Sequence, residues 1–302
     1  MRAYRGVFPA IVTPMTPDGG VSEEGFRAAM EFNIQGGVHG FWVAGGTGES
    51  ILLDDEENNR IVEWAADQNR GRVNNIMHVG APTTRRAAAM AEHAAKAGVE
   101  AICAVPPFFY RPGDEGVVEY YKAVAAAADL PLFLYNLPGA TGVEITVDLM
   151  KKIQDKVPQL AGLKHSSGMT ENIRHFSDMG LACFVGNAYG LLTSLTLGSA
   201  GVVDSSPQMA PEVWVEIYNA YEAGDLARAE KAQRRGAEIT DFMIRYKNPH
   251  SPKVVLGEIT GVDCGDPRLP QLPLSPEQKV QCLREAAEMS LLEKVAVAQA
   301  GD

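Results

Sequence analysis

Short apolar segments and longer amphipathic segments alternate along the chain. The apolar segments are bounded by Gly, Pro, Asn or Asp, which is typical of buried strands. They lie at residues 6–12, 40–44, 75–80, 101–105, 131–135, 160–164, 182–186 and 201–204. A closed barrel of eight strand–helix units needs about 250 residues. The alternation therefore predicts an α/β fold, a (β/α)8 TIM barrel.

The segments between these strands have helical periodicity. They cover residues 22–35, 54–68, 83–97, 115–128, 146–156, 170–179 and 189–197, and a further helix follows Pro211. Thr83 and Thr146 are expected N-caps, and Ser22 precedes acidic residues that suit a first turn. Gly98 stands where a helix should end.

The chain beyond the eighth unit predicts additional helices. We expect the barrel to occupy residues 1–223 and a C-terminal helical extension, packed on the barrel, to occupy residues 224–302. Its helices are predicted at 226–246, 252–259 and 275–298. The proline-rich segment 266–276 separates the last two and should lack regular structure.

Composition narrows the possible partners and location. The chain has 302 residues, of which 46% are hydrophobic and 22% charged, as in globular proteins. A net charge of −11 argues against binding to nucleic acid or to an anionic membrane surface. No apolar run is long enough to span a bilayer, and the two prolines near the N-terminus argue against a signal peptide.

The cysteines and histidines argue against a metal centre. The four cysteines are widely spaced and form no CxxC pair, and the six histidines show no metal-ligand spacing. Reduced thiols in a cytoplasmic protein are the expected state of the cysteines. We therefore expect no metal.

Lys164 is the most informative single residue, because it ends the sixth apolar run. In a TIM barrel the active site lies where strands end. Burial disfavours the charged form of an amine, and a neutral amine is a nucleophile that forms Schiff bases with carbonyl compounds. For one such lysine alone, an ammonium reaching solvent is the more frequent alternative.

Tyr135 strengthens the chemical interpretation of Lys164. It ends the preceding strand, so it should lie beside Lys164 on the same barrel face. A phenol near an imine can donate and accept protons. The alternative is a core tyrosine whose hydroxyl bonds to the backbone.

A glycine-rich segment, Gly45 to Ser50, follows the second strand. Glycines before a helix let successive N–H groups converge on an anion. Gly46, Thr47 and Gly48 are therefore a candidate site for a substrate carboxylate, with the Thr47 hydroxyl as a further donor. The segment is not a phosphate-binding P-loop, because no Gly-Lys-Ser/Thr follows. A tight turn is the alternative, and Glu49 is expected to cap or brace it.

Polar residues also follow the last three strands. His165 should point out of the barrel, because strand side chains alternate, and is interpreted as structural. Asp204 could be a site acid or a capping residue. The candidate substrate-binding residues in these segments are Ser166, Gly186, Asn187, Tyr189, Asp204 and Ser205.

Four motifs occur in order: GVFPAIVTPM, GGTGES, YNLPGATG and GLKHSSG. In these motifs, and over nearly the whole chain, the sequence resembles the N-acetylneuraminate lyase and dihydrodipicolinate synthase superfamily of class I aldolases. The resemblance implies Lys164 as the Schiff-base lysine, Tyr135 as proton donor and acceptor, and Thr47 with Gly46 as the carboxylate site. It also implies a substrate contact by the backbone near Val203. The covalent imine would replace any cofactor, and a homotetramer (a dimer of dimers) is expected.

The sequence departs from both branches of this superfamily. The synthase branch typically has an arginine where this chain has Ala140, and a tyrosine from a neighbouring subunit where it has Phe109. Tyr110, which follows Phe109, is a further candidate substrate-binding residue. The lyase branch typically has an Asp-Glu pair where this chain has Ala188 and Tyr189. The sequence GGTGE, at residues 45–49, resembles the corresponding segment of some dehydratases of keto-deoxy sugar acids.

These features predict a lyase that acts on a small 2-oxo acid. The leading hypothesis is an N-acetylneuraminate lyase-like Schiff-base aldolase, which cleaves or forms a 2-oxo-3-deoxy acid from pyruvate and an aldehyde. A dehydratase of a 2-keto-3-deoxy sugar acid and dihydrodipicolinate synthase are the alternatives within the enzyme class. A non-catalytic barrel with a binding role is the alternative outside it.

Overall fold

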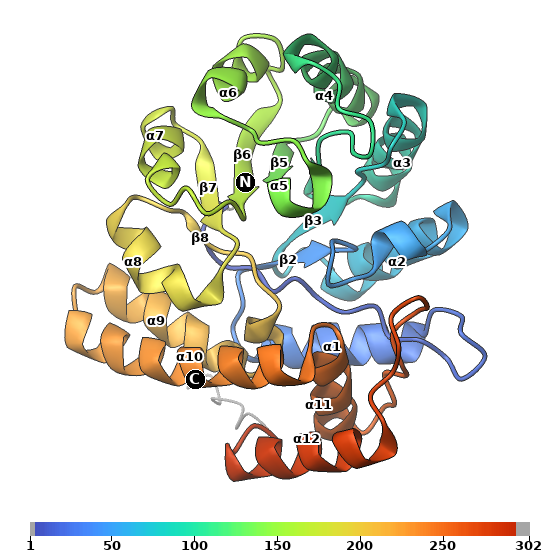
Figure 1. The fold of residues 1–302 in the computed structure, drawn as a ribbon, viewed down its shortest axis with the longest axis vertical. Helices are drawn as coiled ribbons and strands as arrows, with labels where there is room; N and C mark the ends of the chain where they lie inside the picture. Colours follow the sequence, from blue (N-terminus) through green and yellow to red (C-terminus); the bar gives the residue numbers. More distant parts are fainter. Residues whose placement is uncertain (1–3, 294–302) are drawn as a thin grey trace.

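Eight parallel strands form the centre of the protein, described by a computed structural model for residues 4–293 (Figure 1). The strands are β1 (Gly6–Val7), β2 (Gly40–Val43), β3 (Asn74–His78), β4 (Ala101–Ala104), β5 (Leu132–Asn136), β6 (Leu160–His165), β7 (Ala182–Val185) and β8 (Gly201–Val202). The sheet order is β1-β8-β7-β6-β5-β4-β3-β2. All eight predicted strands are present.

Backbone hydrogen bonds near Trp42 close the sheet into a barrel. The N–H of Trp42 donates to Pro9 O at 2.9 Å, and the N–H of Ile11 donates to Trp42 O at 3.2 Å. Strand β1 is shorter than the predicted 6–12. Pro9 has no N–H with which to extend a ladder toward β2, although the N–H groups of Phe8 and Ala10 still donate to Val202 O and Asp204 O. The predicted (β/α)8 TIM barrel is confirmed.

Helices connect and surround the strands, as Figure 1 shows. The helices between strands are α1 (Glu23–Gln35), α2 (Asp55–Asn69), α3 (Thr84–Ala97), α4 (Asp114–Ala128), α6 (Val147–Gln154), α7 (Asn172–Asp178) and α8 (Leu191–Thr196). The predicted caps are found: Ser22, Thr83 and Thr146 each accept an N–H of their own first turn, and Gly98 ends α3 with a φ of 88°. The sequence did not predict the one-turn helix α5 (Pro138–Thr141).

Four further helices follow β8. They are α9 (Pro211–Glu222), α10 (Leu226–Tyr246), α11 (His250–Thr260) and α12 (Pro276–Glu288). Helix α10 lies alongside α9, whereas α11 and α12 lie to one side of the barrel (Figure 1). Helix α12 stops before the predicted end at 298, and residues 294–298 of that prediction lie outside the described residues. Within residues 4–293, no helix has the length and apolar character needed to cross a bilayer.

Two apolar clusters stabilise the barrel. The larger cluster fills the space between the strands and the helices. The smaller cluster fills the barrel interior and includes Phe8, Trp42, Phe133, Phe184 and Tyr135. Because side chains alternate along a strand, the inward positions of β5 and β6 bring Tyr135 and Lys164 to the same end of the barrel.

Candidate active site

Lys164 is buried at the end of β6, directly opposite Tyr135 of β5 in the strand register. Its side chain is 5% exposed. The Nζ atom lies 4.5 Å from the centre of the Tyr135 ring and 5.7 Å from that of the Trp42 ring. No carboxylate of residues 4–293 forms an ion pair with it. The amine therefore lies against aromatic faces rather than reaching into solvent.

His78, at the end of β3, is a further neighbour that the sequence interpretation missed. Burial and the nearby Lys164 amine lower the pKa of His78 to about 4, so its imidazole is neutral at neutral pH. Its Nδ1 atom lies 3.2 Å from Ser50 Oγ, and its ring meets that of Tyr135 edge-on at 6.3 Å. His78 lies near the end of the third apolar run, 75–80, much as Tyr135 and Lys164 end the fifth and sixth runs, and this position was the available signal.

The glycine-rich segment Gly45–Ser50 lies beside Tyr135. A Cβ atom added to Gly46 would lie 3.9 Å from the Tyr135 hydroxyl oxygen. A Cβ atom on Gly48 would lie 2.8 Å from Ala44 Cα, so only glycine fits there. The Thr47 side chain is buried, and its Oγ1 atom accepts a hydrogen bond from Asn248 Nδ2 at 3.1 Å. The structure thus brings Thr47, Tyr135 and Lys164 to one end of the barrel.

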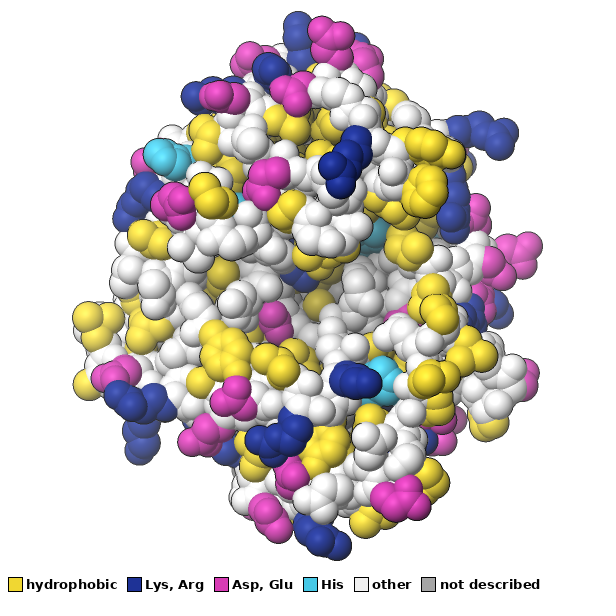
Figure 2. All heavy atoms as spheres, in the orientation of Figure 1, with side chains coloured by type: hydrophobic (Ala, Val, Ile, Leu, Met, Phe, Trp, Pro, Cys, Tyr) yellow, Lys and Arg dark blue, Asp and Glu magenta, His cyan; other side chains and the backbone are white. Residues whose placement is uncertain are grey.

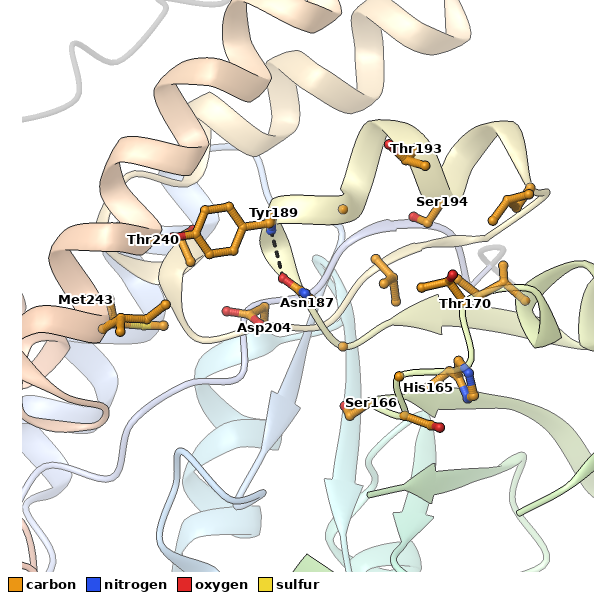
Figure 3. A pocket seen from close by; sticks show the side chains of 18 residues that line it. His165, Ser166, Thr170, Asn187, Tyr189, Thr193, Ser194, Asp204, Thr240 and Met243 are labelled. Atoms are coloured by element: carbon orange, nitrogen blue, oxygen red, sulfur yellow. Dashed lines mark hydrogen bonds between the residues drawn. The ribbon is translucent and has the colours of Figure 1, made fainter. Parts of the chain in front are cut away.

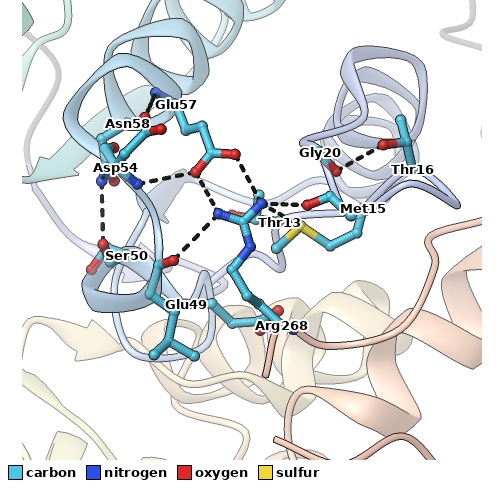
Figure 4. Close-up of polar contacts among 12 residues, drawn as sticks. Thr13, Met15, Thr16, Gly20, Glu49, Ser50, Asp54, Glu57, Asn58 and Arg268 are labelled. Carbon is cyan, nitrogen blue, oxygen red and sulfur yellow. Dashed lines mark hydrogen bonds and ion pairs between the residues drawn. The ribbon is translucent and has the colours of Figure 1, made fainter. Parts of the chain in front are cut away.

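Residues from the C-terminal part of the chain brace this segment. Glu49 forms an ion pair of 2.7 Å with Lys253, and both side chains are fully buried. Its second carboxylate oxygen accepts from the N–H of Arg268 at 2.7 Å and from Gln271 Nε2 at 3.1 Å. The Arg268 guanidinium binds the Glu57 carboxylate and the Leu52 carbonyl (Figure 4). Glu49 therefore has the bracing position expected of it.

A cavity of about 600 Å³ opens beside this end of the barrel, between the ends of β6 to β8 and helices α7, α8 and α10. Figure 3 shows its polar lining, and the space-filling view shows that the face drawn in Figure 1 is hollowed near its centre (Figure 2). Lys164, Tyr135 and Thr47 are not part of the lining. The predicted substrate-binding residues that line it are Ser166, Gly186, Asn187, Tyr189 and Asp204.

Two of these lining residues have distinctive surroundings. The Ser166 hydroxyl is buried and has no hydrogen-bond partner among the described residues. The Tyr189 hydroxyl donates to Asp241 of α10, and burial together with this contact raises the pKa of Tyr189 to about 12. Tyr189 therefore remains a neutral phenol fixed at the rim of the cavity.

The remaining predicted binding residues lie outside the cavity. Ser205 is buried, and its hydroxyl donates to Asn248 Oδ1 at 2.7 Å. Val203 lies in the barrel interior with its N–H bonded to Val185 O. Tyr110 is 79% exposed and packs edge-on against Phe109, which has a φ of 74°. Their roles toward a substrate stay predictions.

His165 has the outward orientation that strand alternation predicted. Its Nε2 atom is 2.9 Å from Met169 O, and its Nδ1 atom is 3.2 Å from Asn136 Nδ2. These contacts hold the His165 ring in place, and His165 also lines the cavity (Figure 3). In residues 4–293, no group of three or more His, Cys, Asp or Glu side chains is placed to hold a metal ion.

A parallel (β/α)8 barrel with a buried lysine beside a tyrosine, at the end where strands stop, is the arrangement of the class I aldolases. The chain matches the Dihydrodipicolinate synthetase family over residues 3–289, and it belongs to that family. This match confirms the resemblance to the N-acetylneuraminate lyase and dihydrodipicolinate synthase superfamily.

Individual relatives agree with this assignment. The chain is 32% identical, over 95% of its length and 97% of the relative, to a 4-hydroxy-tetrahydrodipicolinate synthase of Methanothrix thermoacetophila. It is similar to the crystal structure of dihydrodipicolinate synthase from Aquifex aeolicus (TM-score 0.89, 27% identity, 96% and 99% of the two chains). It is also similar to a catalytic lysine mutant of Ruminococcus gnavus sialic acid aldolase (TM-score 0.90, 27% identity, 96% and 97%). Together the relatives favour the synthase alternative over the lyase-like leading hypothesis.

Proposed function

We propose that this protein is an imine-forming aldolase that uses pyruvate and needs no cofactor. The observation that carries the proposal is the buried Lys164 amine, which lies 4.5 Å from the Tyr135 ring centre and has no ion-pair partner in residues 4–293. An amine held in a buried site without an ion-pair partner is placed to add to a carbonyl carbon and form a Schiff base.

The reaction begins when Lys164 Nζ adds to the keto carbon of pyruvate. Loss of water gives a protonated imine, which accepts the electron pair left when a methyl proton is removed. The resulting enamine carbon forms a bond to the carbonyl carbon of an aldehyde, whose oxygen takes up a proton. Hydrolysis of the imine releases the product, and cleavage is the reverse sequence.

Tyr135 and the glycine-rich segment complete the proposed site. The Tyr135 hydroxyl is the group that moves protons during imine formation and enamine formation. The Thr47 hydroxyl and the N–H groups of Gly46 and Thr47 bind the pyruvate carboxylate. The proximity of Gly46 to the Tyr135 hydroxyl supports this arrangement.

Reductive trapping tests the proposal directly. Sodium borohydride in the presence of pyruvate should add a stable adduct to Lys164, detected by mass spectrometry of the digested protein. The buried Lys253 is an internal control, because its amine is held in an ion pair of 2.7 Å with Glu49 and is fully buried. An adduct on another lysine would refute the mechanism. The absence of any adduct would favour a non-catalytic barrel with a binding role.

The proposal includes the assembly and location expected from the sequence. A homotetramer, a dimer of dimers, is proposed on the resemblance of the motifs. A cytoplasmic location is supported by the cysteines, which are all buried and unpaired: Cys103, Cys183, Cys264 and Cys282.

Synthesis of 4-hydroxy-tetrahydrodipicolinate is the first candidate reaction, supported by the name of the Methanothrix relative. Aspartate semialdehyde is the aldehyde that the resemblance to the synthase branch implies for it. A carboxylate on the aldehyde requires a cation, and Ala140 supplies none. The Arg111 guanidinium lies close to Gly142, where its Nε atom would be 3.1 Å from an added Cβ. Arg111 is therefore the first arginine to test as a replacement for the missing one.

Because Ala140 offers no cation, we expect the protein to condense aspartate semialdehyde with pyruvate only weakly. The activity should increase when a guanidinium is restored at this position. A charge-assisted hydrogen bond contributes about 1.5–3 kcal/mol. Ala140→Arg should therefore raise kcat/KM for aspartate semialdehyde by roughly 10–100-fold, measured by coupled assay. Arg111→Met and the exposed Arg85→Met serve as a matched pair. Efficient condensation by the unmodified protein would contradict this prediction. If that activity is lost in Arg111→Met but kept in Arg85→Met, Arg111 is the residue that binds the aldehyde carboxylate.

A hydroxylated aldehyde is the second candidate, favoured by the polar lining of the cavity. Ser166, Asn187, Thr193 and Asp204 present hydroxyl, amide and carboxylate groups there (Figure 3). This candidate covers a lyase of a 2-oxo-3-deoxy acid, and a dehydratase that uses the same imine.

If the aldehyde is hydroxylated, we expect the protein to prefer shorter 2-oxo-3-deoxy acids over N-acetylneuraminate. Ala188 and Tyr189 replace two acceptors for sugar hydroxyls, and each buried hydroxyl left unpaired costs about 1–3 kcal/mol. Comparison of kcat/KM for cleavage of the two substrate types checks this expectation. A clear preference for N-acetylneuraminate would overturn it.

A further inference from the structure

A chain of side-chain hydrogen bonds connects the backbone near β1 to the Thr47 hydroxyl. The N–H of Val12 donates to Gln208 Oε1 at 3.0 Å, and Gln208 Nε2 lies 2.9 Å from Ser205 Oγ. The Ser205 hydroxyl donates to Asn248 Oδ1 at 2.7 Å, and Asn248 Nδ2 donates to Thr47 Oγ1 at 3.1 Å. The chain therefore ends on a residue of the proposed carboxylate site.

The direction of these hydrogen bonds is fixed by the backbone. Gln208 is fully buried, and its amide faces one backbone donor, the N–H of Val12, and two backbone acceptors, the carbonyls of Ala10 and Ser205. Backbone groups cannot exchange donor and acceptor roles. The Gln208 oxygen must therefore face Val12, and its nitrogen must face Ser205.

That orientation determines every later bond. An amide nitrogen cannot accept a hydrogen bond, so the Ser205 hydroxyl hydrogen cannot point to Gln208. It points instead to the Asn248 oxygen, which leaves the Asn248 nitrogen facing Thr47. The nitrogen donates to Thr47 Oγ1, so the Thr47 hydroxyl hydrogen is directed away from Asn248. No group of the described chain accepts that hydrogen.

We propose that Asn248 is a positioning residue that fixes Thr47 as a hydrogen-bond donor toward the substrate carboxylate. This inference rests on the proposed function, because it assumes that Thr47 binds the carboxylate of pyruvate. A threonine hydroxyl can donate or accept, and only the donor orientation stabilises an anion. Asn248 itself is exposed, so its two hydrogen bonds rather than packing hold its amide.

Two substitutions of similar size separate this role from a purely structural one. Asn248→Asp replaces the donor with an acceptor, so the Thr47 hydroxyl turns toward Asp and the pyruvate carboxylate meets a negative charge. Asn248→Leu removes the donor but leaves Thr47 free to rotate. Asn219→Asp, on the exposed face of α9, controls for the added charge.

The readout is the pyruvate concentration that gives half-maximal borohydride trapping on Lys164, which needs no knowledge of the aldehyde. We expect an increase of roughly 10–100-fold for Asn248→Asp, and of at most about 10-fold for Asn248→Leu. The Asp carboxyl becomes protonated toward its ordinary pKa of about 4 and then regains a donor. The half-maximal pyruvate concentration of Asn248→Asp, divided by that of the unmodified protein, should therefore fall as the pH is lowered from about 8 to about 5. The same ratio for Asn248→Leu should stay constant.

The outcomes distinguish the two proposals. If the unmodified protein traps no pyruvate, the proposed function fails. If it traps pyruvate but both Asn248 variants behave like Asn219→Asp, the positioning role of Asn248 is refuted while the proposed function stands. A loss in Asn248→Leu equal to that in Asn248→Asp, without pH dependence, would show that Asn248 only supports the fold and would also refute the inference.

Discussion

Replacement of Lys164 by alanine should abolish both turnover and borohydride trapping while leaving the barrel folded. The amine is the proposed covalent nucleophile, and removal of such a group blocks the route rather than slowing one step. We expect kcat to fall by at least about 10⁴-fold. The melting temperature should change little, because Lys164 forms no ion pair within residues 4–293 that its removal would break.

Lys122→Ala is the matched control for this experiment. Lys122 is exposed on α4, and Glu119 is its one ion-pair partner within residues 4–293. Its removal should alter neither turnover nor melting. Near-normal turnover by Lys164→Ala would show that the imine forms elsewhere or does not form.

Tyr135→Phe should slow the chemical steps by roughly 10²–10⁴-fold, the usual contribution of a positioned acid–base group. The phenylalanine ring keeps the contact with Lys164 and Trp42, so the substitution removes the hydroxyl and little else. Trapping of pyruvate should be slower but still detectable. Rapid-quench measurement of adduct formation, together with steady-state kcat, separates the two effects.

Tyr121→Phe is the control for loss of a buried tyrosine hydroxyl. The Tyr121 hydroxyl bonds to Ala104 O in the packing of α4, away from Lys164. This variant should lose some stability and keep its kcat. If Tyr135→Phe also keeps its kcat, Tyr135 is a packing residue.

The barrel could be predicted from the sequence because its signals are local. Each strand is a short apolar run, and each helix has its own cap, as Ser22, Thr83 and Thr146 show. The exceptions are also local: β1 ends before Pro9, and α5 is only one turn long. Lys164 and Tyr135 could be placed together because they end consecutive strands of a parallel sheet.

The supporting residues could not be predicted from the same signals. Asn248 and Thr47 are 201 residues apart, and Arg268 and Glu49 are 219 residues apart. No periodicity relates positions at such separations. Ser205 illustrates this limit: its place after β8 made it a candidate binding residue, but nothing local in the sequence indicated that its hydroxyl donates to Asn248.

The contacts between the glycine-rich segment and the C-terminal part of the chain have a consequence for biosynthesis. A ribosome releases the segment around Thr47 long before Asn248, Lys253 and Arg268 emerge. Until then Glu49 lacks its buried ion pair, because Lys253 has not been made. Synthesis proceeds at about 5–20 residues per second, and domains generally fold as units. A nascent chain that already has its eight strands is therefore still without the finished form of the proposed carboxylate site, and the proposed binding of pyruvate should appear only when the last helices dock.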